Sequence, residues 1–129
     1  MIRILVIDDE PAFSDLIFKY FSAMGCAVVV AATGELGLEK FTTTAPDILI
    51  VDNRMPGMDG IEVVRRLRSA KQDVFIVMVT IDKEDDVRAA LYPYSVDRYL
   101  KKPFQFSELN DTLIEMIAAA RNRKKGHRV

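Results

Sequence analysis

Short, unbroken runs of apolar residues rich in valine and isoleucine recur along the chain, and they limit its folds more than any other feature. Four strong runs and a weaker fifth are present: Ile4–Ile7, Ala27–Ala32, Ile48–Val51, Val74–Val79 and Arg98–Leu100. Strands with one face in water alternate apolar and polar residues, whereas strands covered on both faces read as continuous apolar runs. The runs therefore predict the buried strands of a parallel sheet.

Stretches of helical periodicity separate these runs. The clearest helix begins after Pro11 and ends at Gly25, and we expect one face of it to carry six large apolar residues. These residues are Phe13, Leu16, Ile17, Tyr20, Phe21 and Met24. Further helices are expected over residues 34–41, 60–67, 83–91 and 107–120.

Several residues are suited to helix ends. Asp59 followed by Glu62 resembles a capping box at the third helix, and Ser107 is suited to cap the fifth. Pro93 should end the fourth helix early.

The order of strand then helix, repeated five times, predicts an α/β fold with helices on both faces of a parallel sheet. The 129 residues fit a single domain of ordinary size. We expect this domain to span residues 1–121, and residues 122–129 to form a basic tail or the start of a linker that extends or frays the last helix.

Composition excludes several classes of function. With 18 basic and 19 acidic residues, the net charge of −1 provides no overall field that attracts nucleic acid or a membrane surface. No apolar run approaches the length of a membrane span, and no secretory signal opens the chain, so a cytoplasmic location is expected by default. The single cysteine, Cys26, is expected to be a small buried apolar residue.

Polar residues stand at the carboxyl ends of the predicted strands. Asp8 and Asp9 follow the first strand, Asp52 ends the third, Thr80 ends the fourth and Lys102 follows the fifth. Open α/β sheets bind ligands beyond this edge. Each residue alone has an ordinary structural explanation, such as a helix cap or a turn, but five coincidences at one edge favour a site.

Crowded carboxylates repel, by about 4 kcal/mol for two charges about 4 Å apart at an effective dielectric constant of about 20. A shared proton, the Lys102 ammonium or a divalent cation could offset this repulsion. Mg²⁺ is favoured because it takes a few carboxylates and leaves positions for phosphate oxygens. Zinc is disfavoured because the one histidine, His127, lies in the tail and Cys26 lies away from this edge.

Such an arrangement is suited to accepting a phosphoryl group. Asp52 would act as the nucleophile and needs no base because a carboxylate is already ionised. Lys102 and the Thr80 hydroxyl would meet the remaining negative charge of the phosphoryl group.

These residues resemble the receiver domains of two-component response regulators. The resemblance covers residues 2–120 and rests on Asp8-Asp9-Glu10, on Asp52 with the segment 55–60, on Thr80, and on the segment 99–104. It implies a doubly wound, flavodoxin-like sheet of five strands in the order 2-1-3-4-5, with five helices.

The resemblance also implies a mechanism. Asp8, Asp9, Asp52 and the backbone carbonyl of Arg54 would hold Mg²⁺, and a sensor histidine kinase or phosphotransfer protein would be the phosphoryl donor. Thr80 would then shift toward the phosphoryl group and Tyr99 would rotate inward, which changes the surface of the fourth helix, fifth strand and fifth helix. The family's cis peptide at Lys102–Pro103 would aim the ammonium into the site.

The same resemblance sets expectations for partners and activity. A downstream effector protein or output domain would read the change, and a homodimer through the fourth helix is a further expectation. We expect no membrane contact and no direct contact of this domain with nucleic acid. The domain would be no enzyme beyond catalysing its own phosphotransfer and slow autodephosphorylation.

Two departures from the family stand out. Ile81 replaces the small residue usual after the threonine, so we expect slow hydrolysis of the acyl phosphate and slow reaction with small donors. Arg54 and Asp82 occupy positions that tune the attack of water in the family, but the sequence does not give the sign of their effect.

The segment 91–96 also replaces the small residues usual before the fifth strand, which leaves the shape of the signalling surface open.

Two other functions compete with this interpretation. A Mg²⁺-dependent phosphatase of the haloacid-dehalogenase type needs a second acid two residues beyond the nucleophile, and Arg54 stands there instead. An interaction module that works without phosphorylation would have no need of the complete set of site residues.

Overall fold

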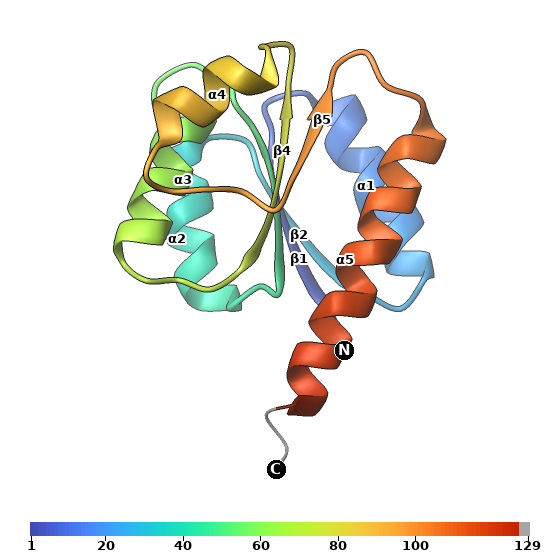
Figure 1. Cartoon of the computed structure of the whole chain (residues 1–129). Helices are drawn as coiled ribbons and strands as arrows, with labels where there is room; N and C mark the ends of the chain where they lie inside the picture. The colour runs from blue at the N-terminus through green and yellow to red at the C-terminus, as the bar shows by residue number, and fades with distance from the viewer. Residues whose placement is uncertain (127–129) are drawn as a thin grey trace.

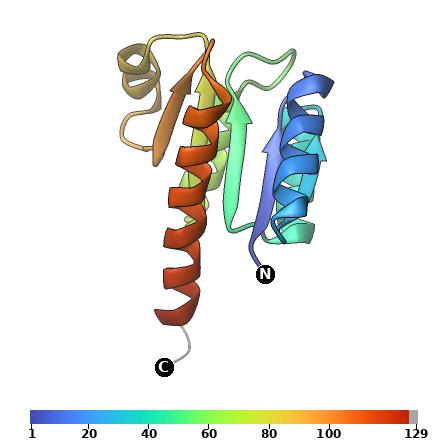
Figure 2. The same ribbon diagram turned by 90° about the vertical axis from the view of Figure 1, so that its right-hand side faces the viewer.

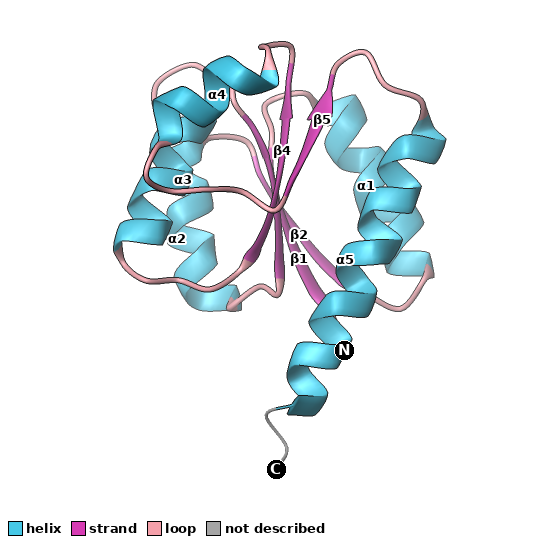
Figure 3. Cartoon of the chain, viewed as in Figure 1, coloured by secondary structure: helices cyan, strands magenta, loops and turns pink. Residues whose placement is uncertain are grey.

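A computed structural model describes residues 1–126 of the chain, and its strands and helices alternate as the sequence predicts (Figures 1 and 3). The strands are β1 (Arg3–Ile7), β2 (Ala27–Ala31), β3 (Ile48–Asp52), β4 (Phe75–Thr80) and β5 (Arg98–Lys101). The helices are α1 (Pro11–Ala23), α2 (Gly34–Thr44), α3 (Gly60–Ser69), α4 (Glu84–Leu91) and α5 (Phe106–Gly126).

The five strands form one parallel sheet in the order β2-β1-β3-β4-β5. Strand β1 lies between β2 and β3, where Val6 is in register with Val30 of β2 and Ile50 of β3. This arrangement confirms the predicted fold and strand order.

The helices cover both faces of the sheet. Helices α1 and α5 lie on one face, and α2, α3 and α4 lie on the other (Figures 1 and 2). Alternate strand residues enter the two cores: Ile4 and Val6 pack on the side of α1 and α5, and Leu5 and Ile7 on the other side. Both faces of β1 are therefore apolar, which explains why its sequence does not alternate.

The buried side of α1 differs from the prediction. Ser14, Ile17 and Phe21 are buried, whereas Leu16 and Met24, which we expected on the same face, are exposed. The part of α1 against the sheet is thus narrower than its apolar stripe. Another member of that stripe, Tyr20, is 38% exposed, and its ring meets that of Phe106 of α5 edge-on, with 4.8 Å between ring centroids.

Two of the three residues that we expected at helix ends act as predicted, and the third does not. The side chain of Asp59 accepts a hydrogen bond from the N–H of Glu62, which confirms its role as cap of α3. Helix α4 ends at Leu91, two residues before Pro93. The prediction for Ser107 is wrong, because α5 begins one residue earlier and Ser107 lies within its first turn.

Helix α2 has a cap that the sequence analysis overlooked. The hydroxyl of Thr33 accepts a hydrogen bond from the N–H of Leu36 at 3.1 Å. The helix also runs three residues beyond its predicted end, to Thr44.

Helix α5 continues to Gly126, six residues beyond its predicted end, and projects past the sheet on the side of the N-terminus (Figure 2). Tertiary contacts hold this extension. The Arg123 guanidinium lies 3.9 Å from the centroid of the Phe75 ring, and Lys124 donates a hydrogen bond to the carbonyl of Met1 at 2.7 Å. His127 and the rest of the expected tail lie outside the described residues.

Two smaller expectations can be compared with the structure. Cys26 is buried, and burial raises the pKa of its thiol, as expected of a small core residue. Within residues 1–126, none of the helices is long and apolar enough to span a membrane.

Candidate functional site

The predicted site residues meet at the carboxyl edge of the sheet, which is the upper edge in Figure 1. Asp8 follows β1, Asp52 is the last residue of β3 and Thr80 is the last residue of β4. Lys102 directly follows β5. Because all the strands are parallel, their carboxyl ends bring these side chains together from distant parts of the chain.

Three carboxylates form a compact group at this edge. Asp8, Glu10 and Asp52 each offer an oxygen, and the three oxygens lie within 4.8 Å of one another. Asp9, which the sequence analysis expected in this role, is exposed and does not belong to the group, although its charge helps to raise the pKa of Asp52.

Glu10 is the site residue that the sequence analysis missed. Its backbone N–H donates to Asp8 Oδ1 at 2.8 Å, in the turn that leads into α1. The adjoining acid in Asp8-Asp9-Glu10 was the available signal. The pattern did not reveal which two of the three carboxylates face Asp52, because the shape of the turn decides it.

Asp8 is the most strongly perturbed member of the group. Burial, with a further contribution from the charge of Asp52, raises its pKa from 3.8 to about 6, against the lowering effect of the hydrogen bond from Glu10. Its Oδ2 atom is buried and has no hydrogen-bond partner among the described residues. A buried carboxylate oxygen without a partner is costly unless a cation or proton joins it.

Asp52 lies beside the Lys102 ammonium. Their Oδ2 and Nζ atoms are 3.5 Å apart, and the same Nζ lies 3.4 Å from Glu10 Oε1 and 3.9 Å from Asp8 Oδ2. Burial raises the pKa of Asp52 despite the opposing effect of Lys102. Burial alone would lower the pKa of Lys102, but the charges of Asp52, Asp8 and Glu10 outweigh it and raise that pKa.

The donor set fits a small, hard cation. All three acidic residues present oxygen, and Asp8 Oδ2 is an acceptor in need of a partner. One ammonium faces three carboxylates, so Lys102 alone leaves the group anionic. Oxygen donors with few protein ligands are what Mg²⁺ prefers.

The loop after β3 holds Asp52 close to the start of α3. The amide of Gly60 donates to the carbonyl of Asn53 at 3.0 Å, and a Cβ atom at position 60 would lie 2.5 Å from the carbonyl oxygen of Asp52. Only glycine allows this approach of two backbone segments. The Asn53 side chain further accepts a hydrogen bond from the N–H of Ile61.

A second polar network surrounds Asp82, just past the end of β4. Asp82 Oδ2 accepts hydrogen bonds from the Thr80 hydroxyl at 3.0 Å and from the Asn53 amide at 2.8 Å. Arg54 pairs with Asp82 Oδ1 through Nη2 at 2.5 Å. The hydrogen bonds from Arg54, Asn53 and Thr80 lower the pKa of Asp82 to about 2, so this carboxylate is ionised at neutral pH.

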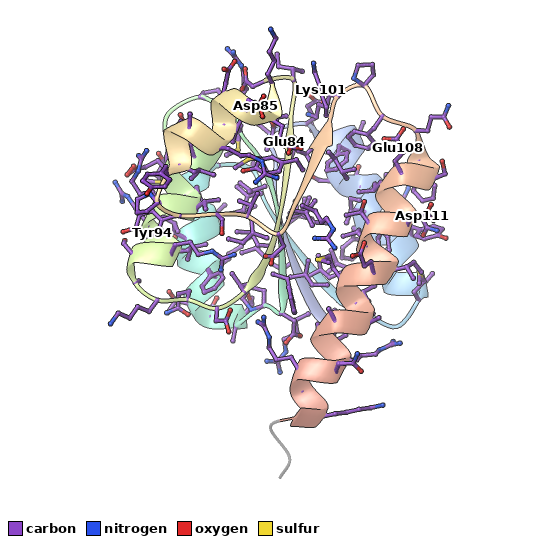
Figure 4. The ribbon with its side chains drawn as sticks, in the orientation of Figure 1. Glu84, Asp85, Tyr94, Lys101, Glu108 and Asp111 are labelled. Carbon is purple, nitrogen blue, oxygen red and sulfur yellow. The ribbon has the colours of Figure 1, made fainter. Side chains whose placement is uncertain are left out.

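Tyr99 is half-buried on β5, and the Arg88 guanidinium of α4 lies 4.9 Å from its ring centroid. A cavity of about 170 Å³ joins Tyr99 to the site, lined by Thr80, Asp82, Glu84, Tyr99 and Lys101. Figure 4 labels two of these residues, Glu84 at the start of α4 and Lys101 at the end of β5. Tyr99 thus lies on a path from Thr80 to the surface of α4 and β5.

Two further expectations concern the neighbours of the site. The Lys102–Pro103 peptide is cis, as the resemblance implies. Ile81 directly follows Thr80 and is 57% exposed, so it does not belong to the core.

Known proteins match nearly all of this chain. The family described as "Response regulator receiver domain" matches residues 4–114. The response regulator MprA of Mycobacterium ulcerans is 37% identical over 123 residues, which cover 95% of this chain and 52% of that protein. This chain therefore spans about half the length of that relative.

Solved structures of response regulators and chemotaxis proteins have the same fold as this chain. The response regulator TrrA of Thermotoga maritima, solved in complex with Mg²⁺-BeF, is 34% identical with a TM-score of 0.77, over 90% of this chain and 99% of that one. The chemotaxis protein CheY4 of Vibrio cholerae is 27% identical with a TM-score of 0.81, over 90% of this chain and 98% of that one.

Proposed function

The chain belongs to the response regulator receiver-domain family, and on that premise we propose that it is phosphorylated on Asp52 with Mg²⁺ held beside it. The observation that carries the proposal is a buried Asp52 carboxylate with the Lys102 ammonium 3.5 Å away and the unpartnered Asp8 Oδ2 in the same acidic group. As a receiver domain, the chain is a signalling protein of a two-component system.

The proposed reaction is a phosphoryl transfer from a phosphohistidine of a partner. An Asp52 oxygen attacks phosphorus, the new P–O bond forms, the P–N bond breaks, and the imidazole retains the electron pair and takes up a proton. Lys102, which lies 3.5 Å from Asp52, and the Thr80 hydroxyl would meet negative charge on the transferred group. The domain would catalyse this transfer and a slow hydrolysis, and no other reaction.

The site residues have separate roles in this proposal. Asp8, Asp52, Glu10 and the Arg54 carbonyl would hold Mg²⁺, with Asp9 contributing charge from the exposed side. Bound Mg²⁺ would neutralise the acidic group and the phosphoryl oxygens. Asp8 must give up its proton for the ion to bind there, so we expect weaker binding below about pH 6.

Phosphorylation would be passed on through Thr80 and Tyr99. The hydroxyl of Thr80 would move to the phosphoryl group and Tyr99 would turn inward, along the cavity that joins them. The result is a changed surface over α4, β5 and α5, a local charge event that biases an element with two arrangements.

Response regulators interact with histidine kinases and with effector or output domains. A sensor histidine kinase or phosphotransfer protein is the donor that we propose for this chain. The homodimer and the cytoplasmic location stay predictions.

Mass spectrometry after incubation with acetyl phosphate tests the proposal. Wild-type protein with Mg²⁺ should gain the mass of one phosphoryl group, and chelation of Mg²⁺ or the variant Asp52→Ala should remove the gain. Asp111→Ala, which removes an exposed carboxylate of α5, is the control (Figure 4). Labelling that persists in Asp52→Ala, or continued turnover of a phosphate ester, would contradict the proposal.

A further inference from the structure

We propose that Asp82 acts as a latch that occupies the Thr80 hydroxyl in the unphosphorylated domain and so lowers its readiness to switch. The inference rests on the proposed phosphorylation of Asp52.

The latch follows from the donors and acceptors around Thr80. An ionised carboxylate only accepts hydrogen bonds, so in the 3.0 Å contact with Asp82 Oδ2 the Thr80 hydroxyl must be the donor. The backbone N–H of Asp82 donates back to the same Oγ1 at 3.0 Å. A hydroxyl has one proton, and this one is engaged by Asp82.

The same proton is the one that switching requires. Asp52 is in register with Val79, the residue before Thr80, so Thr80 stands next to the phosphorylation site on the neighbouring strand. To donate to a phosphoryl oxygen on Asp52, the Thr80 hydroxyl must first leave Asp82. The carboxylate of Asp82 and the phosphoryl group therefore compete for one donor.

Asp82 is held firmly in this position. The Asn53 amide donates to it at 2.8 Å, and Asn53 is itself fixed by the N–H of Ile61 at the start of α3. Arg54 binds the opposite oxygen through both Nε and Nη2. Two residues of the connection between β3 and α3, Asn53 and Arg54, thus keep the acceptor aimed at Thr80, and Thr80 itself is 1% exposed.

A titration with beryllofluoride and Mg²⁺, followed by the backbone amide NMR signal of Asn53, tests the latch. In proteins that contain Thr80, the Thr80 methyl signal also reports the state of its hydroxyl. Asp82→Ala should lower the half-saturating beryllofluoride concentration by roughly tenfold, about the effect of releasing one charge-assisted hydrogen bond. Before any ligand is added, the Thr80 methyl signal should already shift toward its position in the saturated wild type.

Removing a negative charge near the site could strengthen anion binding by itself, so a double-mutant cycle is needed. In a Thr80→Ala background, the gain from Asp82→Ala should shrink by at least about fivefold. Asp85→Ala removes an exposed carboxylate at the start of α4 and serves as the charge control (Figure 4). Asp85→Ala should not shift the NMR signal of the Thr80 methyl group.

The outcomes separate the two proposals. Equal gains with and without the Thr80 hydroxyl, or no gain from Asp82→Ala, would overturn the latch while wild-type binding upholds the phosphoacceptor site. A folded wild type that does not bind beryllofluoride would overturn the proposed function, and the latch with it. If Asp82→Ala does not fold, Asp82→Asn keeps the side-chain volume and carries the same cycle with a smaller gain.

Discussion

At the scale of single residues, the site shows how one carboxyl group can be both costly and useful. Asp8 is 2% exposed, and its Oδ2 has no hydrogen-bond partner among the described residues. Its pKa of about 6 lies above the ordinary value of 3.8. The metal-free folded state therefore retains a proton between these two pH values that the unfolded chain releases, and it becomes less stable as the pH rises through this window.

We predict that Asp8→Asn stabilises the metal-free protein at pH 7.5 by on the order of 1–3 kcal/mol, because it removes the ionised form of a buried group. Urea unfolding at pH 7.5 and pH 5 measures the difference. The advantage of the variant should shrink at pH 5, and Mg²⁺ should no longer stabilise it. An advantage that is the same at both pH values would contradict this account.

The residue that follows Thr80, Ile81, bears on the lifetime of the phosphorylated state. Its exposed side chain follows Thr80 directly and is expected to hinder water from reaching a phosphoryl group on Asp52. Ile81→Ala should therefore speed the loss of the phosphoryl group several-fold, measured as the decay of the phosphorylated mass. Ile114→Ala, which trims an exposed isoleucine of α5, is the matched control and should leave the decay unchanged. Equal decay in both variants would end the idea.

At the scale of elements, the connection from β3 to α3 is the tightest part of the site. Asp59 caps α3, and the amide of Gly60 bonds to the carbonyl of Asn53. The backbone of Asp52 is thereby fixed against the first turn of the helix. The position of Asp52 thus depends on a helix terminus and a glycine that lie outside the acidic group.

We predict that Gly60→Ala destabilises the protein by about 1–3 kcal/mol, because the new Cβ would meet backbone atoms of Asp52 and Asn53 that cannot give way cheaply. The variant should also lower the extent of phosphorylation by displacing Asp52. Gly126→Ala adds a Cβ with no atom within 4 Å and serves as the control in both assays. Unchanged unfolding of Gly60→Ala would refute the close approach.

At the scale of the whole molecule, α5 joins the two ends of the described chain. Lys124 binds the carbonyl of Met1 and pairs with Asp47 at 3.0 Å, while Arg123 covers the Phe75 ring. These contacts lie at the amino ends of the strands, on the edge of the sheet opposite the site. The first part of the expected tail, as far as Gly126, thus extends α5, which was one of its two expected outcomes.

Arg123→Ala should lower the free energy of unfolding by about 1 kcal/mol, since it removes a stacked guanidinium and its hydrogen bond to the Asp73 carbonyl. Denaturant unfolding measures the change. The neighbouring Asn122 is exposed, so Asn122→Ala is the comparison and should have little effect. Equal stability of the two variants would mean that the end of α5 does not pack.

The sequence by itself determined the architecture. Runs such as Ile48–Val51 are apolar throughout because β3 is covered on both faces. An unbroken apolar run can be recognised in the sequence without knowledge of the fold. The sequence also determined the edge where Asp52, Thr80 and Lys102 meet, since parallel strands all end on one side.

Only the tertiary structure decided which neighbours act together. A local turn places Glu10 rather than Asp9 with Asp8 and Asp52. The bend after β4 turns Asp82 back onto Thr80, and a contact between two loops joins Asp82 to Arg54. The extension of α5 depends likewise on a ring far away in sequence, Phe75. Such pairings depend on side-chain directions in the folded chain, to which periodicity and spacing are blind.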